Sequence, residues 1–274
     1  MIHRLLLSTL LVTAFATLAP AQEWGDLEAT FKLKGDFEPK KITPDKDVAV
    51  CTKVKLVEQN WVVDPATKGI ANIAVYFLLT PTGKKPPVHP DYAKTAQDKI
   101  VLDNLNCKYI PHVLNLRTSQ TLVLKNSDPV GHNMKADFFA NVPFNDLIPA
   151  GGQIEKKLPS PEAAFVPVSC AIHGWMNSYL LVRDEPYVGI SDEKGQMVIK
   201  NLPVGEWTFV VWQEKAGYIG DVTLDGKPTT WAVNERKGRV KMTIKPGKNY
   251  LGVAAPTPAT KGIVEITPAT LKIQ

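Results

Sequence analysis

The sequence predicts an all-β protein, built as a β-sandwich with additional β-structure. Twenty-two prolines spread along the 274 residues disfavour long helices. Short apolar segments bounded by Gly, Pro, Asn or Asp alternate with turn chemistry, a pattern typical of sandwiches. The segments expected as strands are rich in branched and aromatic residues and cover residues 72–79, 120–126, 178–184, 196–202, 207–213 and 239–247.

The strand at 239–247 shows the clearest alternation. It should bury Val240, Met242 and Ile244 and expose the residues between them. The segments 191–196 and 202–207 read as turns, since each has a glycine that can take a positive φ. One short helix is expected within residues 89–100.

Residues 1–21 have the composition of a signal peptide. Arg4 supplies the positive charge, residues 5–19 the apolar core, and Ala19 and Ala21 a small-x-small cleavage site. The apolar run is too short for a membrane anchor, and no later segment is long and apolar enough to span a bilayer. We therefore expect an exported protein, periplasmic or extracellular, that is soluble after signal cleavage.

The remaining length suits one large or two small domains. The formal net charge is +5, and the lysines are scattered rather than clustered. Scattered lysines indicate a solvated surface, so a nucleic-acid partner is not expected.

The chain has three cysteines, an odd number for an exported protein. Cys51 and Cys107 lie in segments expected as β-structure, residues 47–56 and 99–113. We predict that they form a disulfide, which would leave Cys170 unpaired. An unpaired thiol can be a buried, inert side chain that packs like an apolar residue. The residues near Cys170 in the sequence therefore have to show whether it has this role or a functional one.

The segment 170–176, CAIHGWM, places Cys170, His173 and Met176 three residues apart. A thiolate, an imidazole and a thioether form a soft ligand set suited to copper, and one more imidazole would complete a blue-copper arrangement. Among the other histidines, His132 has the best context, because it follows the strand 120–126 through the loop SDPVG at a sandwich rim. His112 alternates with apolar residues and is expected to be structural, and His89 lies between prolines and is expected at the surface.

The segments NSDPVGHNM (126–134) and VSCAIHGWM (168–176) together resemble the cupredoxin family, with a ligand loop similar to the amicyanin and plastocyanin types. The resemblance implies a Greek-key β-sandwich that holds one type 1 copper. It implies that His132 and His173 are imidazole ligands, Cys170 the thiolate and Met176 the axial thioether. Asn133 matches the asparagine that hydrogen-bonds across to the cysteine loop.

The resemblance is strong over about residues 105–184. We predict a cupredoxin-like domain with an N-terminal extension over residues 22–185, and the strand at 72–79 is expected to complete its sandwich. Residues 186–274 should form a C-terminal β-module, whose pattern resembles prealbumin-like and carboxypeptidase-regulatory-like modules.

These features predict a one-electron carrier rather than an enzyme. The resemblance implies that the imidazole of His173 reaches the surface and passes the electron to extracytoplasmic redox proteins, such as a c-type cytochrome or a dehydrogenase. The sequence has no second cysteine in the ligand loop for a binuclear copper site and no His-x-His pairs for a multicopper site. It also has no C-x-x-C-H motif for a c-type haem. A cysteine hydrolase lacks a motif for its base and oxyanion hole.

Two alternatives remain at this point. The chain could be a non-redox β-sandwich module that binds carbohydrate or cell envelope, with Trp207, Trp212 and Trp231 as candidate exposed aromatics. It could also store or deliver copper, although a closed site of four ligands releases metal poorly.

Overall fold

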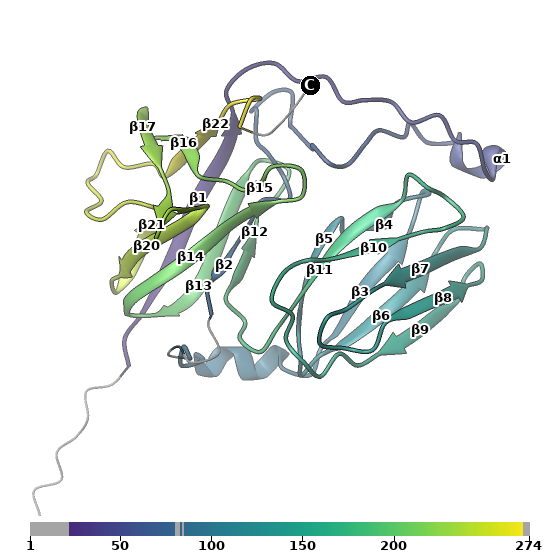
Figure 1. Ribbon diagram of the computed structural model, residues 1–274, viewed down its shortest axis with the longest axis horizontal. Helices are drawn as coiled ribbons and strands as arrows, with labels where there is room; N and C mark the ends of the chain where they lie inside the picture. The colour runs from purple at the N-terminus through teal and green to yellow at the C-terminus, as the bar shows by residue number, and fades with distance from the viewer. Residues whose placement is uncertain (1–21, 80–82, 84, 271–274) are drawn as a thin grey trace, which may run out of the picture.

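The computed structural model describes residues 22–79, 83 and 85–270 and confirms an all-β architecture. The segment expected to be the signal peptide lies outside the described residues. Two β-sandwiches lie side by side along the long axis of the molecule (Figure 1). Among the described residues, none of the helices has the length and apolar character needed to span a membrane.

One sandwich, here called the motif sandwich, contains both segments of the cupredoxin resemblance. Its two sheets enclose an apolar core that includes Leu102, Leu122 and Leu124, all fully buried. The first sheet has the order β4 (Tyr109–Ile110), β3 (Lys99–Asn104), β6 (Thr121–Asn126), β9 (Gln153–Lys156). The second has the order β5 (Val113–Arg117), β11 (Asn177–Arg183), β10 (Val166–Ser169), β7 (His132–Ala136), β8 (Phe144–Ile148).

The other sandwich, here called the terminal sandwich, combines strands from both ends of the chain. One sheet has the order β13 (Gln196–Pro203), β1 (Trp24–Leu33), β22 (Ile263–Ile266), β16 (Asp221–Leu224), β17 (Lys227–Thr230), with β21 (Gly247–Tyr250) also paired to β1. The other has the order β12 (Val188–Ile190), β2 (Ala74–Phe77), β14 (Gly205–Gln213), β15 (Gly217–Tyr218), with β20 (Arg239–Ile244) paired to β14. A small hairpin joins β18 (Ala232–Val233) to β19 (Arg236–Lys237).

Most strand predictions are confirmed. In β20, Val240, Met242 and Ile244 are buried as expected. The short helix expected within residues 89–100 is η1, a 3-10 helix over Pro90–Thr95. β1 is not among the expected strands, although the burial of its side chains alternates strictly along all ten residues.

The expectation that residues 72–79 complete the motif sandwich is wrong. β2 pairs with β12 and β14 of the terminal sandwich. All four of its residues are buried, because Val75 and Phe77 face the terminal core while Ala74 and Tyr76 face the junction between the sandwiches. The domain boundary near residue 185 stays a prediction. Strands β1 and β2, which precede this boundary, pair with strands β12, β13 and β14, which follow it.

The junction between the sandwiches has a small apolar core of its own. Phe165 stacks on Trp212 with their ring centroids 4.0 Å apart. His112 lies beside this core and contacts the Asn177 carbonyl through Nδ1 at 3.1 Å and Glu214 Oε1 through Nε2 at 2.6 Å. The prediction that His112 is a structural histidine with satisfied hydrogen bonds is therefore confirmed.

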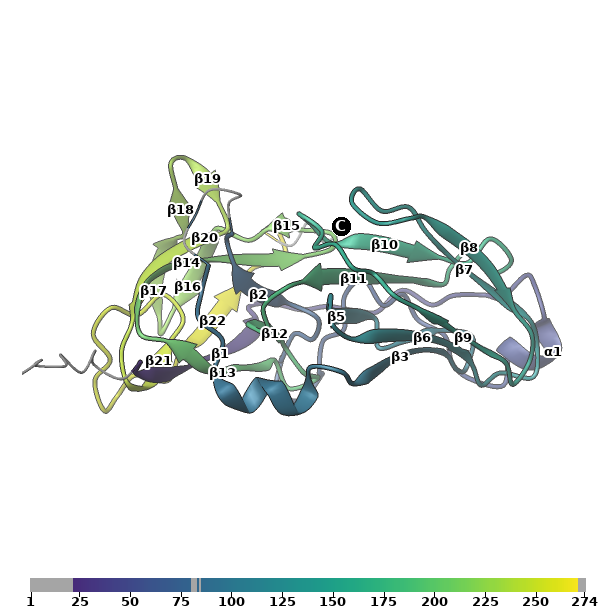
Figure 2. The same cartoon turned by 90° about the horizontal axis from the view of Figure 1, so that it is seen from below.

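Residues 34–60, here called the strap, form a long segment that spans from the terminal sandwich to the motif sandwich. The strap leaves the end of β1 in the terminal sandwich and runs to the far end of the motif sandwich, where α1 (Val48–Cys51) lies, before it returns (Figures 1 and 2). A disulfide between Cys51 and Cys107 fastens α1 there, as predicted. The β-structure expected around Cys51 is wrong, because the N–H groups of Val50 and Cys51 bond to the Asp47 carbonyl and close a helical turn.

Candidate metal centre

Strand pairing brings the two halves of the motif together. β10 runs antiparallel to β7, with Ser169 opposite Lys135 and Val168 opposite Ala136. Because the chain enters the 170–176 loop at the end of β10, that loop lies beside His132 at the start of β7. Register alone therefore places residues nearly forty positions apart at one rim of the motif sandwich.

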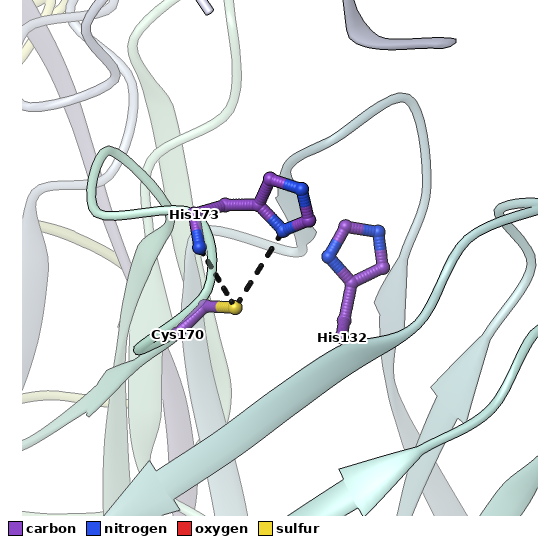
Figure 3. Close-up of side chains that lie close together, drawn as sticks. All are labelled: His132, Cys170 and His173. Atoms are coloured by element: carbon purple, nitrogen blue, oxygen red, sulfur yellow. Dashed lines mark hydrogen bonds between the residues drawn. The ribbon is translucent and has the colours of Figure 1, made fainter. Parts of the chain in front are cut away.

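His132, Cys170 and His173 form a compact, buried cluster. Each offers a ligand atom, and these atoms all lie within 4.8 Å of one another. The three residues are 0%, 3% and 0% exposed. Nδ1 of His173 lies 3.8 Å from Cys170 Sγ, and a ring nitrogen of His132 faces the same gap (Figure 3).

The outer nitrogens of both rings are engaged by carboxylates. Nε2 of His132 lies 2.9 Å from Asp128 Oδ2, and Nε2 of His173 lies 2.9 Å from Asp47 Oδ2. A carboxylate accepts hydrogen bonds and so favours the proton on Nε2, which leaves Nδ1 free to bind a metal. Nδ1 of His132 is buried and has no hydrogen-bond partner among the described residues.

The ligand loop closes on itself around the cluster. The Met176 N–H donates to the His173 carbonyl at 2.8 Å, and the Cys170 N–H donates to the Met176 carbonyl at 3.2 Å. The His173 N–H lies 3.4 Å from Cys170 Sγ. Met176 is 2% exposed and packs in the same apolar cluster as Cys170.

Asn133 ties β7 to the ligand loop. Its Oδ1 accepts the Ala171 N–H at 2.6 Å and lies 3.4 Å from Cys170 Sγ. Its Nδ2 donates to Asn145 Oδ1, and the buried Tyr109 hydroxyl donates to its carbonyl at 2.6 Å. The side chain therefore makes the cross-loop contact that the resemblance implies.

The protonation of the cluster favours a thiolate. Burial by itself raises the pKa of Cys170, but the nearby His132 ring and the His173 N–H outweigh it and lower the pKa to about 6. Burial by itself lowers the pKa of His132, but the hydrogen bond to Asp128 and the nearby sulfur raise it to about 9. Near neutral pH the metal-free cluster is thus a thiolate beside an imidazolium.

This pairing predicts that metal binding releases protons. Between pH ~6 and ~9, copper(I) must displace one proton from His132, so the apparent affinity should rise about tenfold per pH unit and level off above about 9. Below about 6, Cys170 must also lose a proton, and the dependence should steepen. Calorimetric titration in buffers of different ionisation enthalpy counts the released protons, and a count of zero at pH 7.5 would contradict this protonation state.

The donor set fits copper. A thiolate with two imidazoles is a soft, nitrogen-rich set, and its buried position excludes water. A second cluster, formed by Cys107, Asp128 and His132, is also compact. It cannot supply a thiolate, because Cys107 is in the disulfide.

The expectation that the His173 imidazole reaches the surface is wrong. The residue is 0% exposed, because Asp47 on the strap covers the Nε2 edge of its ring. Asp47 itself keeps 38% of its side-chain surface exposed. Trp175 contacts the ring of His173 from another side, at 5.1 Å between centroids, and donates from Nε1 to the Cys107 carbonyl.

Sequence reasoning missed both carboxylates. Asp128 lies four residues before His132, a local signal that the SDPVGH segment offered. Asp47 has no such signal, since 126 positions separate it from His173 and the strap is held against the motif sandwich by the disulfide and by apolar packing of residues such as Leu56. Tyr109, which holds the Asn133 carbonyl, was missed for the same long-range reason.

The tryptophans proposed for carbohydrate binding are not exposed platforms. Trp207 and Trp231 are 8% and 4% exposed and belong to the terminal core. Trp212 is partly buried and stacks on Phe165 at the junction. The exposed aromatics that would favour a carbohydrate-binding module are therefore not found at these three positions, whereas the prealbumin-like pattern of the C-terminal segment is a separate observation that this finding does not affect. His89, expected at the surface, is partly buried and accepts the Asp91 N–H.

Comparisons with known proteins find similarity in structure alone. No family model matches the chain, and no curated protein matches it. One similar structure, a copper-containing nitrite reductase (NirK) from Thermus scotoductus SA-01, is 15% identical with a TM-score of 0.28; the match covers 39% of this chain and only a quarter of the reductase chain.

Two smaller proteins match over nearly their whole length. An amicyanin variant in the Cu(I) form is 16% identical with a TM-score of 0.29, and the match covers 38% of this chain and 97% of that one. A purple cupredoxin from Nitrosopumilus maritimus is 21% identical with a TM-score of 0.26, and the match covers 31% and 99%. All three matches cover less than half of this chain at TM-scores below 0.3, and the β-sandwich architecture is established by the strand pairing of the chain itself.

Proposed function

We propose that this chain is an exported protein that binds one copper ion in a blue, type 1 site and carries single electrons. The observation that carries the proposal is the buried Nδ1 of His132, which has no hydrogen-bond partner among the described residues and belongs to a cluster with Cys170 and His173. A buried, unpartnered nitrogen costs free energy unless a ligand satisfies it.

The side chains have distinct roles in this proposal. Cys170 would supply a strongly donating thiolate, His132 and His173 would supply imidazoles through Nδ1, and Met176 would supply a weakly bound thioether. Copper, when bound, supplies the one-electron couple. The strands and the closed loop hold these ligands in one arrangement, which limits the reorganisation that an electron transfer would require.

Compartment and partners follow from the chemistry. The Cys51–Cys107 disulfide fits an oxidising compartment, in agreement with the signal-like composition of residues 1–21. The partners would be extracytoplasmic redox proteins, such as a c-type cytochrome or a dehydrogenase. We propose a carrier rather than an enzyme, because the four proposed ligands fill the coordination positions and leave none for a substrate.

Met176 gives the sharpest test of the ligand set. If its thioether is the axial ligand, Met176→Leu should favour Cu(I) and raise the reduction potential, while the blue colour survives on the other three ligands. Met176→Gln should lower the potential, because a harder amide oxygen favours Cu(II). Potentiometric titration of the copper-loaded proteins should rank the leucine variant highest, the natural protein next and the glutamine variant lowest.

The control for this series is stability. Leucine nearly conserves the volume of methionine, so Met176→Leu should lower the free energy of unfolding by less than ~1.5 kcal/mol. Equal potentials in all three proteins, with folding and copper content intact, would show that Met176 is only a core residue. A titration that is not a reversible one-electron step would count against the carrier role itself.

A further inference from the structure

The strap contacts the ring of His173 through the side chain of Asp47. Asp47 lies at the start of α1, and its Oδ2 is 2.9 Å from Nε2 of His173. The Asp47 backbone has φ 44° and ψ 41°, a left-handed conformation that few residues other than glycine, asparagine and aspartate adopt. Its carbonyl accepts the N–H groups of Val50 and Cys51, both at 2.9 Å, so the turn that holds this conformation ends at the disulfide.

Cys107, the other cysteine of the disulfide, belongs to the segment that holds the second carboxylate, Asp128. The N–H groups of Asn106 and Cys107 donate to Asp128 at 2.7 and 2.8 Å, and Asp128 in turn contacts Nε2 of His132. The Cys51–Cys107 bond therefore joins the two backbone segments that position the carboxylates on the two histidines.

We propose that Asp47 is a positioning residue of the metal centre, and that the disulfide-tethered strap closes the outer edge of His173. The effect of Asp47 on bound copper rests on the proposed function. The contact between Asp47 and the His173 ring is a property of the metal-free protein and does not depend on it. The carboxylate fixes the ring so that Nδ1 points at Cys170, and it excludes solvent and reagents from Nε2. Its negative charge, added to that of Asp128, favours the more highly charged Cu(II).

The first test measures access to His173 in the metal-free protein. Diethyl pyrocarbonate reacts with accessible imidazole nitrogens, and peptide mapping reports each histidine separately. In the natural protein His173 should be protected, while the partly exposed His89 should react. In Asp47→Ala the His173 ring should lose its protection and react at a rate approaching that of His89, while His132 stays protected by Asp128.

Matched variants distinguish the contribution of the Asp47 side chain from that of the strap that carries it. Asp45→Ala changes an exposed carboxylate two residues away and should leave His173 protected. Asp47→Asn suits the left-handed backbone, keeps an oxygen acceptor and removes only the charge, so it should keep the protection. The paired change of Cys51 and Cys107 to alanine should expose His173 as Asp47→Ala does, because Asp47 would lose its tether.

The second test measures the reduction potential of the copper-loaded proteins. Asp47→Asn should raise the reduction potential while His173 stays protected from diethyl pyrocarbonate. If Asp47 had only a structural role, a variant that keeps this protection would not change the potential. Asp45→Ala should leave the potential unchanged. An unchanged potential in Asp47→Asn, or continued protection of His173 in Asp47→Ala, would overturn the inference. Failure of the natural protein to bind copper, with the protection pattern as expected, would reject the proposed function and leave the positioning role standing.

Discussion

Cys170→Ser is expected to abolish the intense visible colour of the copper-loaded protein and to remove tight copper binding. The colour arises from charge transfer between a thiolate and Cu(II), and a serine hydroxyl is neither ionised nor soft at neutral pH. The thiol of Cys170 is buried beside His132 and His173, and no other free cysteine exists to replace it. Absorption spectra and equilibrium dialysis of the two proteins measure the loss.

The fold should survive this substitution. Serine is close to cysteine in size, and its hydroxyl could donate to the neighbouring Asn133 Oδ1 and accept the His173 N–H. Far-ultraviolet circular dichroism should therefore stay of the β type. A Cys170→Ser protein that keeps both its colour and its copper affinity would exclude Cys170 as a ligand.

Removal of the disulfide is expected to have the largest effect on stability. The bond closes a loop across a sequence separation of 56, for which the chain-entropy model gives about 4 kcal/mol. The paired change of Cys51 and Cys107 to alanine should lower the free energy of unfolding of the motif sandwich by about that amount. Urea unfolding of the metal-free proteins, followed by circular dichroism, measures the difference.

The natural protein treated with a reductant is the control for the alanine side chains. It should lose comparable stability, because it lacks the same cross-link while it keeps both sulfurs. An unchanged unfolding midpoint in both cases would mean that packing, rather than the disulfide, holds the strap against the motif sandwich.

The sequence was sufficient for features that depend on local patterns. Alternating apolar residues predicted β20, and the odd cysteine count predicted both the disulfide and the unpaired Cys170. The cluster of His132, Cys170 and His173 was also predicted, because its two halves follow strands with a recognisable motif. The signals for β20 and for each half of the cluster lie within a few residues of the feature, whereas the signal for the disulfide is the count of three cysteines in the whole chain.

The features that were missed depend on contacts between distant segments. β2 shows the same composition as a strand of the motif sandwich, and only its pairing with β12 and β14 assigns it to the terminal sandwich. Asp47 looks like an ordinary surface carboxylate until the disulfide brings it to His173. The buried state of His173 could not be predicted, because the strap that covers it lies outside the ligand motifs.

The central claim is that one copper ion binds to His132, Cys170, His173 and Met176, and copper titration of the natural protein tests it most directly. Absorption and electron paramagnetic resonance spectra recorded during the titration should show one copper per chain, an intense visible band and the narrow copper hyperfine splitting of a thiolate-bound type 1 site. A colourless copper complex, or zinc retained in preference to copper when both are supplied in equal amounts, would contradict the claim.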